Sequence, residues 1–142
     1  MKRRNSELQL RSFRVEEFTR RLTTLDEMKA DLEKKLAELG DSVEREKHRA
    51  ADSEIGRLAF PNFVQSIELR RDNIRATMKE LVRERAAVQD DLTTAAQDLR
   101  SFELAEQDRR RRIGEAATRE ANSRVEHAAL MRHLQKHTVR QT

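Results

Sequence analysis

The 142-residue chain contains no cysteine, tryptophan or tyrosine, and it has only one proline and three glycines. Without cysteine there is no disulfide and no thiol chemistry, which allows a reducing compartment. So few turn-forming residues, with only 4% aromatic residues, argue against a compact globular core. What remains is 39% charged and 36% hydrophobic, a balance that suits a single domain of long, charged helices.

Long apolar runs are also missing. No stretch approaches the 18 apolar residues of a membrane span, and the basic residues 2–4 lead into no apolar signal segment. We therefore expect a cytoplasmic protein. The net charge is +4, from 30 Lys and Arg against 26 Asp and Glu with the two signs interleaved. A dedicated nucleic-acid binder would concentrate its basic charge on one face, so no nucleic-acid partner is expected.

Apolar residues recur every three or four positions through the first third of the chain. This spacing keeps one stripe of a helix facing a partner helix. Acidic residues precede basic ones by four positions on the outer faces, which also favours a helix. The pattern predicts a helix over about 3–48, with Gly40 as a weak point inside it. The stripe consists of Leu8, Val15, Phe18, Leu22, Leu25, Leu32, Leu36, Leu39 and Val43, and the charged pairs are Glu7–Arg11, Glu16–Arg20, Glu17–Arg21, Asp31–Lys35 and Asp41–Arg45.

A connector is expected over about 49–60, where the first stripe stops. Gly56 and Pro61 are the only close glycine–proline pair in the chain. Because proline is tolerated in the first turn of a helix, the second helix is predicted to begin at about Pro61. Asp52 and Ser53 are able to cap a single helical turn inside the connector.

A second apolar stripe begins directly after the connector. It predicts a helix over about 61–138, and Arg71 and Arg85 are polar breaks that can fix its register. After Phe102 the stripe fades although helix-forming residues continue, so 103–142 is expected to be an extension beyond the paired region. The stripe consists of Val64, Ile67, Arg71, Ile74, Met78, Leu81, Arg85, Val88, Leu92, Ala95, Leu99 and Phe102.

A short connector makes the two helices antiparallel neighbours. With the turn centred near residue 55, residue i faces roughly residue 110 − i, and Leu8 lies near Phe102. The predicted fold is all-α: a long antiparallel two-helix coiled-coil hairpin whose second helix is longer than the first.

No constellation of residues points to catalysis. The chain lacks a glycine-rich phosphate loop and an H-E-x-x-H motif, and we expect neither enzyme activity nor a cofactor. His133 and His137 have the spacing of two metal ligands on one helix, but no further ligands converge, so no metal site is predicted. The basic run Arg109–Arg112 is either a solvated helix surface or a contact for an acidic protein partner.

The tip of the hairpin carries two of the five phenylalanines, Phe60 and Phe63. Their rings either fold inward and close the end of the hairpin or project as apolar anchors for a partner. Ile67 and Leu69 lie on different faces of the same helix, so that one can pack in the seam while the other faces outward.

Residues 60–74 read Phe-Pro-Asn-Phe-Val-Gln-Ser-Ile-Glu-Leu-Arg-Arg-Asp-Asn-Ile, and this segment resembles the flagellar export protein FliJ family. The basic N-terminus that leads into Leu8, Leu10, Phe13, Val15 and Phe18 is similar to the family's opening. The chain length, the hairpin design and the fading C-terminal helix match as well. The resemblance covers nearly the whole chain, although its specific part is residues 60–74.

The resemblance implies a component of the flagellar type III export apparatus, similar to the central stalk of rotary ATPases and peripheral to the membrane only through its partners. The region beyond the tip is implied to contact the cytoplasmic domain of the export gate through Phe60, Asn62, Phe63, Ile67, Arg70, Arg71, Asp72 and Asn73. The end that holds the termini is implied to sit in the hexameric export ATPase through Leu8, Arg11, Val15, Leu99, Phe102, Arg109, Arg110 and Arg112. Export chaperones are further implied partners. Phe63 and Ser66 depart from the residues that other members carry, which weakens the implied gate contact.

Three alternatives stay open. The first is the homologous stalk of a virulence injectisome, and the second is a generic coiled-coil tether or homodimer with no export role. A basic helix that binds nucleic acid through Arg109–Arg112 is the third, and it predicts salt-sensitive binding.

Overall fold

The computed structural model describes residues 2–141, with the backbone alone for residues 139–141. Helix α1 spans Lys2–Ala51 and helix α2 spans Glu54–Gln141, and no strand occurs within the described residues. The all-α class and the longer second helix are therefore confirmed. The chain divides into two units, residues 1–97 and residues 98–142, and each is described by itself.

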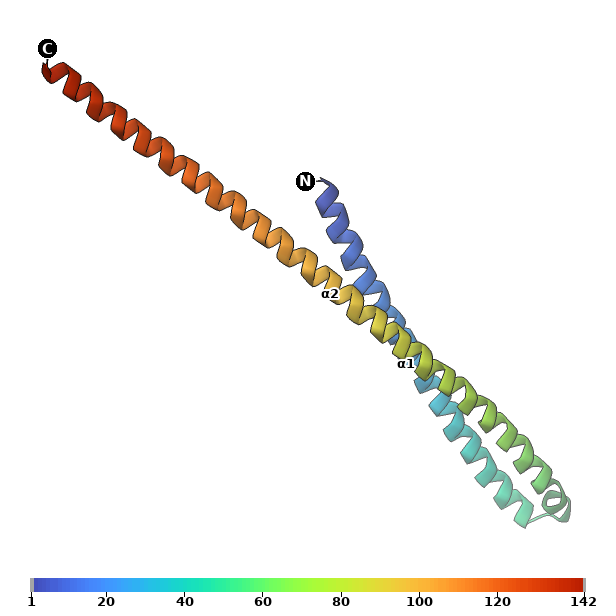
Figure 1. Cartoon of the computed structure of the whole chain (residues 1–142). Coiled ribbons are helices and arrows are strands. Elements are labelled where there is room, and N and C mark those ends of the chain that lie inside the picture. The colour runs from blue at the N-terminus through green and yellow to red at the C-terminus, as the bar shows by residue number, and fades with distance from the viewer. Residues whose placement is uncertain (1, 142) are drawn as a thin grey trace. The chain divides into compact units, whose positions relative to one another are not determined.

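The first unit is an antiparallel helical hairpin, in which α1 lies beside the first half of α2 (Figure 1). Its core is a leucine-rich cluster of Leu22, Leu25, Leu81 and Val88, against which Phe18, Leu32 and Leu92 pack. Every predicted stripe residue from Val15 to Val43 and from Val64 to Ala95 is buried or half-buried. Full burial of a leucine or valine side chain stabilises a fold by roughly 1.5–3 kcal/mol, so the four buried residues of the cluster contribute the most per residue. The two predicted stripes are thus confirmed as one seam.

The register of the hairpin is visible in two contacts between the helices. Arg85 donates hydrogen bonds to both carboxylate oxygens of Asp26, at 2.6 and 3.4 Å. Nearer the turn, the Arg71 guanidinium lies beside Gly40. In both pairs residue i faces residue 111 − i, one residue from the predicted relation. Glu84 receives a further hydrogen bond from Arg21, which crosses the seam diagonally.

The turn between the helices is shorter than predicted. Only Asp52 and Ser53 separate them, so the expected connector over 49–60 is wrong. The Ser53 hydroxyl accepts a hydrogen bond from the Gly56 amide at 3.2 Å, and the Ser53 carbonyl accepts one from Arg57 at 3.0 Å. Ser53 is therefore the N-cap of α2 itself, whereas we expected it to cap an isolated turn.

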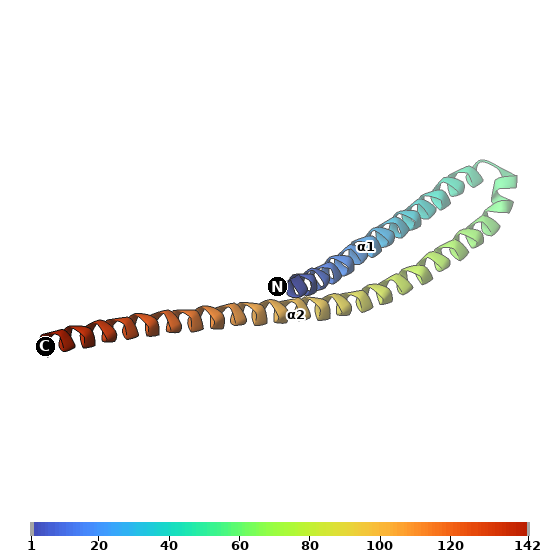
Figure 2. The same ribbon diagram turned by 90° about the horizontal axis from the view of Figure 1, so that it is seen from above.

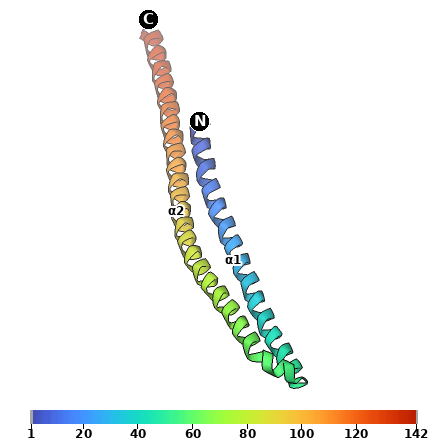
Figure 3. The ribbon, with the colours of Figure 1, turned by 90° about the vertical axis from the view of Figure 1, so that its right-hand side faces the viewer.

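Pro61 lies inside α2 and does not begin it. It has no N–H to offer the carbonyl of Arg57, and its ring crowds that carbonyl, which bends a helix. The first turns of α2 run across the end of the hairpin before the helix turns alongside α1 (Figures 2 and 3). The bend lets the Ser53 cap start the helix early, which explains why the predicted start at Pro61 is wrong.

The second unit is a continuation of α2 and is helical throughout its described residues. Leu99, Phe102, Glu106 and Arg109 are half-buried, but every side chain from Arg110 to Thr138 is exposed. The predicted fading of the apolar stripe agrees with this loss of burial. The unit boundary at 97/98 lies slightly before the predicted start of the extension at 103.

Candidate partner-binding surfaces

The first turns of α2 expose two large apolar side chains. Ile55 is 80% exposed and Leu58 is 77% exposed, and their i,i+3 spacing places them on one side of the helix. The close turn holds this segment in place, since a Cβ added at Gly56 would lie 3.1 Å from the Cα of Ala50. Sequence reasoning missed these two residues because it assigned them to the connector. Their signal was the Ser53 cap, which can start a helix at residue 54.

The aromatic residues that follow are less exposed. Phe60 and Phe63 are both half-buried, so the structure favours neither a closed plug nor fully projecting anchors. Ile67 is only 4% exposed and Leu69 is 62% exposed, which confirms that they lie on different faces of α2. Ile67 is therefore a seam residue, and its assignment to a partner contact is corrected because its side chain packs inside the hairpin.

The polar residues assigned to the tip contact divide into two kinds. Asn62, Arg70, Asp72 and Asn73 are exposed and accessible to a partner. Arg71 is half-buried and donates a hydrogen bond to Glu68 at 2.7 Å. Its guanidinium is engaged within the hairpin, which agrees with the predicted polar break in the seam better than with a partner contact.

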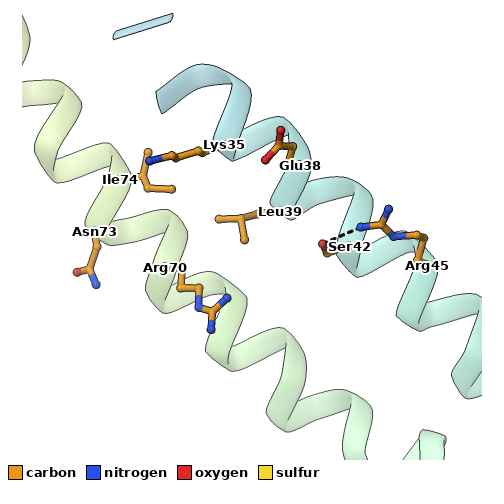
Figure 4. Close-up of a pocket in the computed structure, with 8 residues that line it drawn as sticks. All are labelled: Lys35, Glu38, Leu39, Ser42, Arg45, Arg70, Asn73 and Ile74. Carbon is orange, nitrogen blue, oxygen red and sulfur yellow. Dashed lines mark hydrogen bonds between the residues drawn. The ribbon is translucent and has the colours of Figure 1, made fainter. Parts of the chain in front are cut away.

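An open groove of about 670 Å³ runs along one side of the seam near the tip. Leu39 lies between the two helices at its floor, Lys35 extends from α1 towards Ile74 of α2, and Arg45 turns back towards Ser42 (Figure 4). We call it the basic groove; it is lined by Lys35, Glu38, Leu39, Ser42, Arg45, Arg70, Asn73 and Ile74.

A second groove of about 500 Å³ lies across the seam from the basic groove. With 3.6 residues per turn, Arg75 and Val82 lie on the opposite side of the α2 seam from Arg70 and Asn73. We call it the apolar groove; it is lined by Leu36, Arg75, Met78, Lys79, Val82 and Arg83. Two of its three basic residues are paired with carboxylates on α2, Arg75 with Asp72 at 3.6 Å and Arg83 with Glu80 at 3.1 Å.

The residues assigned to the export ATPase lie in both units. In the first unit, Leu8, Arg11 and Val15 are half-buried, and Arg11 lies 3.7 Å from Glu7. Of the five in the second unit, Leu99, Phe102 and Arg109 are half-buried, and Arg110 and Arg112 are exposed. The contact of these residues with an export ATPase stays a prediction.

The basic run of the second unit is largely neutralised along its own helix. Asp108 accepts from Arg111 at 2.8 Å and from Arg112 at 3.0 Å, and Arg109 lies 3.9 Å from Glu106. Exposed pairs of this kind contribute little to stability, but they reduce the positive potential that a polyanion would meet. The run is therefore a weaker phosphate-binding surface than its sequence indicates.

No cluster of three or more potential metal ligands occurs among residues 2–138, whose side chains are described. His133 and His137 stack with their ring centroids 5.8 Å apart. In the same part of the chain, neither helix holds a segment long and apolar enough to span a bilayer.

The chain was compared with known proteins at three levels. No protein-family model, no curated protein and no solved structure matches it. The surfaces described above are therefore interpreted from their own chemistry and from the resemblance of residues 60–74.

Proposed function

We propose that this chain is a non-enzymatic stalk of the bacterial flagellar type III export apparatus, which couples the export ATPase ring to the export gate. The observation that carries the proposal is the position of the FliJ-like segment 60–74 in the molecule. This segment begins at the bend of α2 and follows the closed end of the hairpin. With the gate contact at the closed end, the first residues of α1 and the basic run of the second unit are proposed, each by itself, as contacts for the ATPase.

Several properties of the molecule support a coupling role. The seam is continuous from Val15 to Ala95, and the described residues contain a single two-residue break between helices. Because a helix rises about 1.5 Å per residue, the seam sets the distance between the turn and the open end of the hairpin. The exposed pair Ile55 and Leu58, with the polar residues Asn62, Asp72 and Asn73, offers a partner both apolar area and hydrogen-bonding groups.

The proposed mechanism needs no chemistry from this chain. ATP hydrolysis would take place in the ring, and the stalk would bias ring assembly and the gate's response to proton flow. Export chaperones would bind an exposed surface of the same protein. This assigns association with the inner-membrane export apparatus to protein contacts rather than to insertion in the bilayer.

Two purified partners test the proposal: the hexameric export ATPase and the cytoplasmic domain of the gate, both from the organism that encodes this chain. Co-sedimentation at moderate salt should show binding to each. Arg110→Glu with Arg112→Glu should weaken binding to the ATPase alone, and Asn62→Ala with Asp72→Arg should weaken binding to the gate domain alone. Lys79→Glu with Arg83→Glu, on the apolar groove, is the matched charge control.

Absence of binding to both partners would remove the proposal. Binding to the ATPase of a virulence injectisome in preference to the flagellar one would assign the chain to that system. A stable homodimer that binds neither ATPase would identify a generic tether, and sedimentation velocity distinguishes it from an elongated monomer.

A further inference from the structure

The basic groove differs from the apolar groove in how its charges are satisfied. The sequence predicts that Asp31 pairs with Lys35 and Asp41 with Arg45, but neither pair forms. Arg45 instead donates to the Ser42 hydroxyl at 3.2 Å. Lys35 and Arg70 make no ion pair with any residue in the described part of the chain. Three cations thus line one groove without a carboxylate partner.

Only one carboxylate, that of Glu38, lines the same groove, so the lining carries a formal excess of two positive charges. The contrast with the apolar groove is informative because both grooves belong to the same seam. The apolar groove is lined by three cations and no carboxylate, but Asp72 and Glu80 on α2 pair with Arg75 and Arg83 and leave only Lys79 without a carboxylate partner among the described residues. Unneutralised positive charge beside a concave apolar surface is the arrangement that attracts an acidic, partly apolar ligand.

The floor and the length of the basic groove indicate the form of that ligand. Leu39 and Ile74 are half-buried seam residues that line the groove. From Lys35 to Arg45 the groove follows α1 for about 15 Å at 1.5 Å per residue, or roughly three helical turns. A groove between two packed helices accepts a third helix, which places apolar side chains at i, i+3, i+4 and i+7 on the floor.

We propose that the basic groove docks an acidic amphipathic helix from another protein. Its apolar face would cover Leu39 and Ile74, and carboxylates on its two flanks would reach Lys35 and Arg45 on one side and Arg70 on the other. A second copy of this chain fits less well, because the chain has a net charge of +4 and interleaves its signs along each helix. Asn73 supplies a further polar contact at the α2 rim.

Arg70 and Asn73 also belong to the segment assigned to the export gate. The inference nevertheless goes beyond the proposed function, since it requires a groove built from both helices and names the chemistry of its ligand. The test uses no export component, so failure of the groove leaves the stalk proposal intact, and the reverse also holds.

The probe is a fluorescein-labelled synthetic helix with leucine at heptad positions a and d, glutamate at e and g, and alanine elsewhere. Fluorescence anisotropy measures its Kd for the full-length chain. A matched peptide with glutamine in place of glutamate tests the charge. Arg45→Glu with Arg70→Glu disrupts the basic groove, and Arg75→Glu with Arg83→Glu makes the same charge change at the two paired cations of the apolar groove.

We expect the basic-groove variant to weaken binding of the acidic peptide by about tenfold or more, which corresponds to about 1.4 kcal/mol. The apolar-groove variant should change Kd by less than about twofold, because Arg75 and Arg83 are already paired with Asp72 and Glu80 on α2. The glutamine peptide should bind the unaltered chain about tenfold more weakly than the glutamate peptide. Circular dichroism tests whether both variants remain helical. If the Arg45→Glu, Arg70→Glu variant loses helicity, the Arg45→Gln, Arg70→Gln variant replaces it.

Equal weakening by the two double variants would show general attraction to a cationic surface and would overturn the inference. Equal binding of the glutamate and glutamine peptides would overturn it too. If sedimentation velocity shows a dimer that Arg45→Glu with Arg70→Glu dissociates, the groove is occupied by a second copy, and an external helix is the wrong ligand.

Discussion

The guanidinium of Arg71 on α2 lies close against the position that a side chain at residue 40 of α1 would take. A Cβ added at Gly40 would lie 3.2 Å from Nη2 of Arg71, and Arg71 is held nearby by its hydrogen bond to Glu68. The glycine that looks like a weak point in the sequence thus accommodates a polar residue in the seam. The contact also fixes the register, because a shift of the helices would bring another residue opposite the arginine.

Gly40→Ala should raise the free energy of unfolding, by up to about 1 kcal/mol, because alanine is the better helix former. Arg71 must give way by a few tenths of an ångström, which the end of a flexible side chain can do. In an Arg71→Ala background the crowding is absent, and the gain from Gly40→Ala should be larger. Chemical denaturation of the four chains measures the difference. Gly114→Ala, where an added Cβ would meet nothing within 4 Å beyond the neighbouring backbone of its own helix, shows the effect of helix propensity alone as a gain in helicity.

Leu81→Asp should destabilise the hairpin by about 3 kcal/mol or more, because it removes a core leucine and buries an unpaired carboxylate. Leu81 is 6% exposed in the core cluster, whereas its neighbour Val82 is 52% exposed. Val82→Asp makes a comparable change one position away and should cost much less. Urea denaturation followed by circular dichroism compares the two variants. Similar midpoints for both would contradict the assigned seam.

The Asp26–Arg85 pair should make stability depend on pH in the acid range. The hydrogen bond from Arg85 lowers the pKa of Asp26 below its ordinary value of 3.8. The folded chain therefore binds this proton less tightly than the unfolded chain does, so the pair stabilises the fold above about pH 4 and loses its effect as the pH falls through the lowered pKa. Both side chains are about half-exposed, so the effect is small and screened by salt.

Thermal melts of the unaltered chain and of Asp26→Asn test this relationship. The two melting temperatures should differ most above about pH 5 and converge as Asp26 becomes protonated. A constant difference down to about pH 2 would show that the aspartate contributes through packing and not through its charge.

Ser53→Ala should cost about 1 kcal/mol, because it leaves the Gly56 amide at the start of α2 without its capping oxygen. Ser66→Ala is the matched control: Ser66 is exposed inside α2, beyond its first turns, where alanine is the better helix former. Guanidinium denaturation should therefore move the two midpoints in opposite directions. Destabilisation by both substitutions would argue against the N-cap at Ser53.

The sequence was sufficient to predict the seam and, to within one residue, its register. Both follow from the spacing of large apolar residues such as Leu25 and Leu81, whose burial dominates the energy of a coiled coil. The start of α2 was mispredicted because Pro61 was interpreted as a helix start. A proline inside a helix can instead bend it, and the Ser53 cap favours a helix that starts at Glu54 and bends at Pro61.

The candidate surfaces were less predictable because small energies decide them. Whether Arg45 pairs with Asp41 or turns to Ser42 depends on a few tenths of a kcal/mol, so the basic groove has no signature in the sequence. Ile67 was assigned to a partner through the resemblance, although its place in the heptad already puts it in the seam. Ile55 and Leu58 became recognisable only once the helix was known to begin at Glu54.

The two-residue turn has a consequence for how the hairpin forms. Contacts beside the turn join residues close in sequence, whereas the Asp26–Arg85 and Arg21–Glu84 contacts join residues 59 and 63 positions apart. Loop-closure entropy grows with the length of chain enclosed, so pairing that starts at the capped turn closes only short loops. The seam can then extend away from the turn one heptad at a time, as a zipper does. Unfolding follows the reverse order, so the end of the seam farthest from Ser53 opens first.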